Sequence, residues 1–143
     1  VCHAELGAEL VRPLLTEAGF PAETVDQVSQ AVLTHRYRAQ RIPVSIEAKI
    51  VYDADKLDSL GAVGVGRAFL FAGRIHARLH NTAGEALGSA AYSREDTAYR
   101  EYLVKLSRLR ECMLTEPGRR IAAERSAVMD AFFLELNRET GLS

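Results

Sequence analysis

Residues 49–67 read KIVYDADKLDSLGAVGVGR, and this stretch decides both the fold and the chemistry that the sequence predicts. It places three carboxylates, Asp53, Asp55 and Asp58, within six residues that have apolar neighbours on both sides. Carboxylates among apolar residues are costly unless they are paired, hydrogen-bonded or bound to a metal. Three glycines and then Arg67 follow, and the fixed fork of donors on an arginine suits a phosphate group. The stretch is therefore a candidate metal or phosphate site, and the alternative is a helix that carries salt-bridged aspartates.

Composition describes an ordinary globular chain. Its 143 residues are 48% hydrophobic and 26% charged, which is enough for one domain with a real core. The net charge is -1 and the basic residues are scattered, so a nucleic-acid partner is not favoured. No apolar run approaches the ~20 residues of a membrane span. Two cysteines do not make a disulfide framework, so we expect a reduced, cytoplasmic protein that does not enter a membrane.

The first half of the chain predicts two helices before the acidic stretch. The first runs from about residue 3 to 18, with a single apolar stripe of Leu6, Leu10 and Leu14, and Gly19 suits the position just after its end. The second runs from about residue 22 to 38. Residues 24–27 have the form of a capping box that would start it.

Two histidines in these helices are candidates for function. His3 lies in the first turn of the first helix, where the ordinary interpretation is a frayed terminal histidine. His35 continues the apolar face of Val25, Val28 and Val32, where the ordinary interpretation is a satisfied core residue. The basic cluster Arg36, Arg38 and Arg41 follows His35 closely, so we predict that His35 contacts a phosphate or a second metal.

A third helix should carry the acidic stretch, with Ser45 as its N-cap. At about 100° per residue, Asp53 shares the apolar stripe of Ile46 and Leu57, whereas Asp55 lies on a different side of the helix. Burial alone therefore selects Asp53 as the important carboxylate. Gly64 and Gly66 are expected to keep the next helical surface flat for close packing.

The second half of the chain also predicts helices. Residues 73–94 have no stable period and are interpreted as a loop or lid. Helices then fill residues 95–140, with Ser93 as a predicted cap and Pro117 in the first turn of the last helix. Almost no segment alternates like a strand, so the predicted fold class is all-α.

The acidic stretch resembles the last signature of the HD-domain metal-dependent phosphohydrolases. The resemblance rests on residues 53–58 and on the Gly61, Gly64 and Arg67 pattern, and it is closest to the bacterial nucleotide-hydrolysing branch. It continues through Lys105-Leu106, Thr115-Glu116 and Arg125, so it covers nearly the whole chain. It implies a single HD-like helical domain over residues 1–143, with metal-site helices in residues 1–72.

The resemblance also assigns roles to residues. The family pattern selects Asp55 as a metal ligand, with His3 as a supplementary one, for a hard divalent metal such as Mn, Mg or Fe. It makes Asp53 and Asp58 supporting carboxylates that orient a ligand or a bound water. His35, Lys56 and Arg67 become catalytic candidates that hold charge on a substrate phosphate. The alternative for both Lys56 and Arg67 is an ordinary surface cation.

One departure from the family pattern is large, because the sequence contains no His-Asp dipeptide. The predicted domain is therefore N-terminally incomplete, and we expect about 30–60 further residues to supply a histidine and a His-Asp pair, as one or two typical helices would. The predicted function is hydrolysis of nucleotides or related phosphorylated small molecules. The alternative is a catalytically inactive helical module that senses a ligand or binds a partner. An exposed apolar surface where the missing helices belong would favour a homo-oligomer.

Overall fold

The computed structural model describes residues 2–36 and 41–142, and these are all helix, turn or loop with no strand among them. The predicted all-α fold class is confirmed over this part of the chain. The helices are α1 (His3–Glu17), α2 (Ala22–Thr34), α3 (Ile46–Leu57), α4 (Gly61–Arg74), α5 (Ala83–Gly88), α6 (Ala98–Val104), the 3-10 helix η1 (Leu106–Cys112) and α7 (Glu116–Thr140). The described residues contain no helix that is both long and apolar enough to cross a membrane.

The chain divides into two compact units. One comprises residues 1–56 with residues 113–118, and the other comprises residues 57–112 with residues 119–143.

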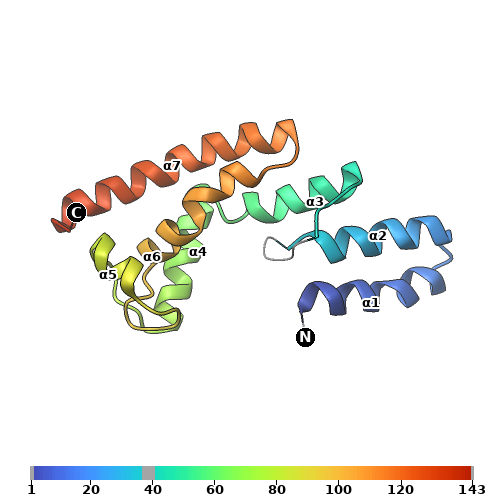
Figure 1. The fold of residues 1–143 in the computed structure, drawn as a ribbon, viewed down its shortest axis with the longest axis horizontal. Coiled ribbons are helices and arrows are strands. Elements are labelled where there is room, and N and C mark those ends of the chain that lie inside the picture. The colour runs from blue at the N-terminus through green and yellow to red at the C-terminus, as the bar shows by residue number, and fades with distance from the viewer. Residues whose placement is uncertain (1, 37–40, 143) are drawn as a thin grey trace. The chain divides into compact units, whose positions relative to one another are not determined.

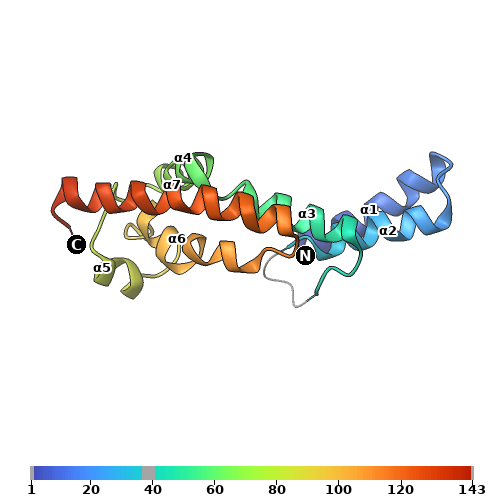
Figure 2. The same cartoon turned by 90° about the horizontal axis from the view of Figure 1, so that it is seen from above.

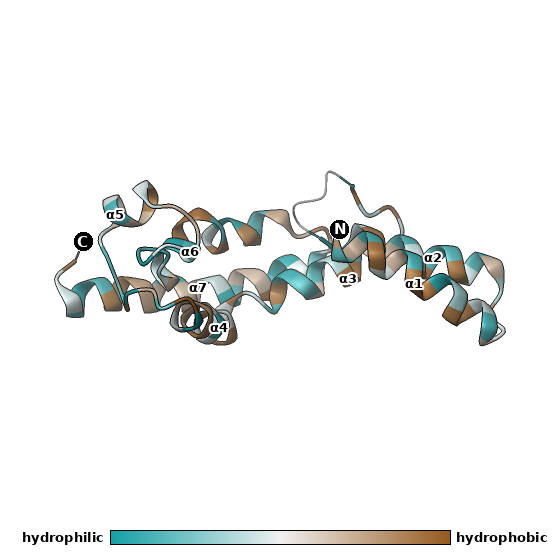
Figure 3. Ribbon diagram, turned by 90° about the horizontal axis from the view of Figure 1, so that it is seen from below, coloured by the Kyte–Doolittle hydropathy of each residue, from teal (hydrophilic) through white to brown (hydrophobic). Residues whose placement is uncertain are grey.

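The first unit is built on a hairpin of α1 and α2, which lie side by side along their length (Figure 1). Gly19 adopts a φ of 82° just past the end of α1, as the sequence predicts. Small side chains pack the hairpin, since Ala4, Ala8 and Ala31 are buried. The predicted leucine stripe of α1 is not buried, and Leu6, Leu10 and Leu14 are 45–64% exposed. Brown, hydrophobic segments recur along α1 in Figure 3.

Two predicted helix boundaries in this unit have different outcomes. The Ser45 hydroxyl accepts the backbone N–H of Ala48, so Ser45 caps α3 as predicted. The predicted capping box at residues 24–27 is wrong, because α2 begins at Ala22 after Pro21 and Thr24 already lies inside the helix. The C-terminal residues predicted for the second helix, including Arg38, lie outside the described residues.

The second unit gathers α4, α5, α6 and η1 around a core that includes Leu106, Leu109, Met129 and Phe133 (Figure 2). The predicted Ser93 cap is wrong: α6 begins after Thr97, whose hydroxyl accepts the N–H of Arg100. Gly64 is a close-packing glycine as expected, because a Cβ there would lie 2.2 Å from the Ser59 carbonyl oxygen and 2.9 Å from Met129. The same expectation for Gly66 is wrong, since its added Cβ would meet no atom within 4 Å.

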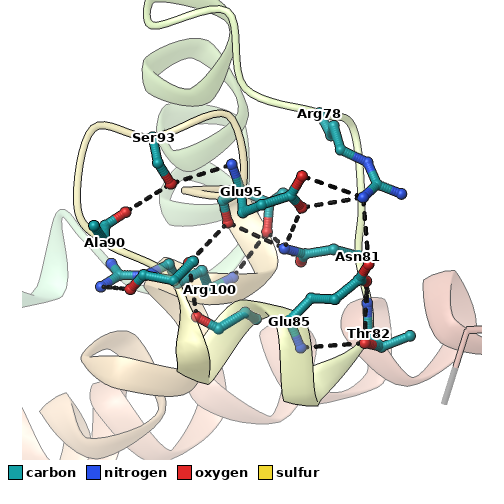
Figure 4. A network of polar contacts seen from close by, with 11 residues as sticks. Arg78, Asn81, Thr82, Glu85, Ala90, Ser93, Glu95 and Arg100 are labelled. Carbon is teal, nitrogen blue, oxygen red and sulfur yellow. Dashed lines mark hydrogen bonds and ion pairs between the residues drawn. The ribbon is translucent and has the colours of Figure 1, made fainter.

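Residues 73–94, predicted to be a loop or lid, contain the short helix α5 and a dense polar network (Figure 4). Thr82 and Glu85 form a reciprocal capping box at the start of α5. Arg78 pairs with both Glu95 and Glu85, and the fully buried Asn81 donates to the backbone and side chain of Glu95. These contacts tie the segment to the start of α6 through specific hydrogen bonds.

Candidate functional site

The first unit holds five of the seven residues that the sequence singles out. His3 opens α1, His35 follows the last residue of α2, and Asp53, Asp55 and Lys56 belong to α3. The remaining two, Asp58 and Arg67, lie in the second unit and form an ion pair with each other. Both partners of that pair are more than half exposed.

The α1–α2 hairpin brings His3 and His35 together. In an antiparallel pair of helices, the start of the first lies beside the end of the second, and these two residues occupy those positions. Their Nε2 atoms are 3.2 Å apart, although 32 residues separate them in sequence. Their ring centroids are 5.3 Å apart. The two imidazoles therefore bring two ring nitrogens close enough to act on one ligand.

A second contact fixes the tautomer of His35. Its Nδ1 lies 2.5 Å from the carbonyl oxygen of Val32, and since a carbonyl only accepts, Nδ1 must carry the proton. In the neutral ring, the lone pair is then on Nε2, the atom that faces His3. A backbone carbonyl on the far nitrogen is the arrangement that commonly orients a metal-binding histidine.

The histidine pair fits a shared divalent ion. Two nitrogens each about 2.1 Å from one ion, at an angle of about 90–109°, lie about 3.0–3.4 Å apart, and the Nε2 atoms meet that requirement. The same separation suits a hydrogen bond from the Nε2–H of His3 to the Nε2 of His35. Over residues 2–36 and 41–142, no three His, Cys, Asp or Glu side chains gather into a metal-binding group. This part of the chain therefore offers two nitrogens for an ion, and a full ligand set needs additional donors.

Asp53 and Asp55 have different surroundings. Asp53 is 2% exposed, and its two oxygens accept the backbone N–H groups of Leu114 and Thr115 and the Thr115 hydroxyl at 2.6–2.8 Å. The Asp55 side chain is 54% exposed and pairs with Lys56 at 3.2 Å. Asp53 therefore joins α3 to residues 114–115, whereas the Asp55 carboxylate remains accessible.

Lys56 is among the largest fully buried side chains of the chain, although an amine is expected at the surface. Its Nζ donates to the carbonyl oxygen of His35, pairs with Asp55, and lies 3.6 Å from the centroid of the Tyr52 ring. The sequence carries a signal for the ring contact, because Tyr52 and Lys56 are four residues apart on one helix. No local pattern indicates the contact with His35, which lies 21 residues away in sequence.

Cys2 and Arg36 lie beside the histidine pair, and sequence reasoning missed Cys2. Arg36 donates to the Sγ of Cys2 at 3.2 Å. This contact, together with the backbone N–H groups of Ala4 and Glu5, lowers the pKa of the Cys2 thiol below its ordinary value. The position of Cys2 immediately before His3 was the available signal.

Comparison of the sequence with known proteins shows which family it resembles. A family model of the HD domain matches residues 1–60. The chain is 36% identical over 125 residues to the uncharacterized protein YpgQ of Bacillus subtilis (strain 168), and the match covers 85% of this chain and 55% of YpgQ. The chain thus spans about half the length of this curated relative.

Solved structures show the same likeness. A crystal structure of Bacillus subtilis YpgQ superposes with a TM-score of 0.70 at 34% identity, over 92% of this chain and 63% of that one. YpgQ has also been crystallised in complex with ADP, with a TM-score of 0.68 to this chain. An HD-superfamily hydrolase from Bacillus thuringiensis matches with a TM-score of 0.72 at 25% identity, over 96% of this chain and 64% of that one. From the family model, the shared helices and these relatives, the chain belongs to the HD-domain superfamily.

Proposed function

We propose that the complete protein is a metal-dependent phosphohydrolase acting on nucleotides or related phosphorylated small molecules. The observation that carries the proposal is the approach of the His3 and His35 Nε2 atoms to 3.2 Å, with the proton of His35 fixed on Nδ1. Membership in the HD-domain superfamily supports the reaction class. The complex of YpgQ with ADP supports the nucleotide as the class of substrate.

In this proposal, His3 and His35 are ligands of a divalent ion of Mn, Mg or Fe, and additional donors complete the set. Asp55 is a further ligand by the family resemblance, although it does not gather with the two histidines into a metal-binding group in the residues that the structure describes. The chemistry that such an ion supplies is polarisation of a phosphoryl oxygen and activation of water. His35 presents a lone pair whose direction is set by its bond to Val32, and Asp55 presents a half-exposed carboxylate. Arg36, which follows His35, supplies a guanidinium suited to charge on a phosphate. The assignments of Asp53, Asp58 and Arg67 remain predictions from the resemblance.

The test starts from the product of the complete reading frame, because the proposed reaction needs a His-Asp pair that these 143 residues do not contain. The purified protein is assayed against nucleoside mono-, di- and triphosphates with Mn²⁺ or Mg²⁺, and its metal content is measured. We expect hydrolysis that chelation abolishes, and a loss of more than about 100-fold in Asp55→Asn. Glu47→Gln is the matched control, because Glu47 is an exposed carboxylate on the same helix. Full activity in Asp55→Asn would remove Asp55 from the site.

A second candidate is a catalytically inactive module that binds a nucleotide without cleaving it. It applies if the complete reading frame contains no His-Asp pair, and the complex of the relative YpgQ with ADP supports the binding of a nucleotide. Calorimetry with ADP separates the two candidates. Binding of ADP with no turnover of any nucleotide, with either metal present, would establish the sensing module.

A further inference from the structure

We propose that Lys56 is a positioning residue. Its amine holds the Asp55 carboxylate at a set position relative to His35 at the end of α2. This inference rests on the proposed function for its chemistry. It departs from the simpler expectation that Lys56 meets a substrate phosphate directly.

The burial of Lys56 argues against direct contact with a substrate. Its side chain is 2% exposed, and its amine already meets the His35 carbonyl, the Asp55 carboxylate and the face of Tyr52. A buried ammonium is stable only when such partners replace its lost water. A phosphate would have to displace at least one of these contacts to reach the amine.

The identity of these partners indicates what Lys56 does instead. The His35 carbonyl belongs to the residue that follows α2, whereas Asp55 and Tyr52 belong to α3, so one amine links two segments 21 residues apart. His35 and Asp55 are also two of the proposed metal ligands. Because Lys56 contacts the backbone of the first and the carboxylate of the second, it limits the movement of both donors.

The surroundings of Lys56 allow a substitution that separates folding from positioning. Methionine has a similar length and no donor, and replacing a buried charge with an apolar side chain of similar volume is often neutral or stabilising. The partner that loses its cation, Asp55, is 54% exposed and can be hydrated. We therefore expect Lys56→Met to fold, while the link between α2 and α3 is lost.

The experiment compares the complete wild-type protein with Lys56→Met and with Lys49→Met, which makes the same chemical change elsewhere on α3. Mn²⁺ affinity is measured by electron paramagnetic resonance, and the His imidazole signals of the metal-free proteins are measured by NMR. In Lys56→Met, we expect a Kd for Mn²⁺ that is about 10–100-fold weaker, a lower kcat and an unchanged KM. We also expect shifted His35 signals in the absence of metal, whereas Lys49→Met should resemble wild type in every measurement.

The outcomes distinguish this inference from the proposed function. An increase in KM alone, with unchanged Mn²⁺ affinity and unchanged His35 signals, would show that Lys56 contacts substrate and would overturn the inference. A wild-type protein that binds no metal and hydrolyses no nucleotide would instead overturn the proposed function. In that case, NMR of the metal-free proteins tests the positioning role of Lys56. Shifted His35 signals in Lys56→Met would support this role, and unchanged signals would overturn it.

Discussion

Asp53 accepts both the backbone N–H of Thr115, at 2.8 Å, and the Thr115 hydroxyl, at 2.6 Å, across 62 residues of sequence. The Thr115 hydroxyl in turn accepts the N–H of Gly118, so it caps the first turn of α7. A Cβ at residue 118 would lie 2.2 Å from the Asp53 carboxylate, so a larger residue there would force this carboxylate to move. These contacts give the first aspartate of the acidic stretch a structural role, because they join α3 to the segment that begins α7.

We expect Asp53→Asn to lower the free energy of unfolding by about 2–4 kcal/mol. The amide that replaces one oxygen would face backbone donors, and buried donors that lose a charged acceptor are costly. Urea unfolding measures the change. Asp26→Asn is the control, because Asp26 forms an exposed ion pair with Arg12 and such pairs contribute about 0–1 kcal/mol. Equal stability of the two variants would contradict the structural role of Asp53.

Two glycines of α4 should respond in opposite directions to the same substitution. Gly64→Ala places a methyl group 2.2 Å from the Ser59 carbonyl oxygen, so we expect a loss of about 2–4 kcal/mol in the free energy of unfolding. Gly66→Ala meets no atom within 4 Å and removes a flexible residue from a helix interior, so we expect a gain of about 0.5–1 kcal/mol. Thermal unfolding of both variants checks the prediction, and a stable Gly64→Ala variant would show that the turn at Ser59 relaxes.

His80 should make the second unit less stable in mild acid. It is buried against Tyr99, with its Nε2 2.8 Å from the Asn137 Oδ1, and burial lowers the pKa of its imidazole. In the unfolded chain, a histidine takes up a proton as the pH falls through about 6.5, whereas the folded protein resists protonation. The unfolded state then binds more protons, so the free energy of unfolding falls as the pH decreases below about 6.5.

Unfolding measured between pH 7.5 and pH 5 tests this dependence. His80→Gln keeps a donor for Asn137 and removes the titrating group, so its stability should fall less steeply with decreasing pH. The control is His76→Asn, which replaces an exposed histidine at a φ of 57°, a conformation that asparagine tolerates. A slope in His80→Gln equal to that of wild type would assign the acid sensitivity to other groups.

Arg100 should keep the segment before α6 in place. Its guanidinium donates to the Ser89 carbonyl oxygen and to Asp96, and Asp96 also accepts the N–H of Tyr92, a residue with a φ of 62°. Arg100→Met removes these donors, so we expect amide hydrogen exchange in residues 89–96 to increase by about 10-fold and stability to fall by about 1–2 kcal/mol.

Mass spectrometry of exchange in the second unit measures this effect. Arg120→Met is the matched control, because Arg120 forms an exposed pair with Glu124 and should change stability by no more than about 0.5 kcal/mol. Unchanged exchange of residues 89–96 in Arg100→Met would show that the capping box of α5 and the Arg78 contacts hold the segment without it.

Features that depend on neighbouring residues can be predicted from the amino-acid sequence alone. The all-α fold class, the Ser45 cap, the position of Gly19 after the first helix and the end of the last helix at residue 140 follow from periodicity and from local backbone preferences. The family could also be recognised from the sequence, because the resemblance rests on one continuous stretch, residues 53–67. The HD-domain family model matches residues 1–60. The start of α6 could not be predicted locally, because both Ser93 and Thr97 are suitable caps. Thr97 caps the helix, since its hydroxyl accepts the backbone N–H of Arg100 and donates to the side-chain oxygen of the buried Asn81.

Contacts between side chains that are distant in sequence depend on how the helices pack. His3 and His35 approach because two helices turn back on each other, and no local pattern encodes a distance across 32 residues. The helical periodicity of about 100° per residue correctly placed Asp53 on the buried face. Its partners at residues 114 and 115, however, come from a segment distant in sequence. Lys56 is buried for the same reason, since its amine finds a carbonyl, a carboxylate and an aromatic ring that replace water only in the folded chain.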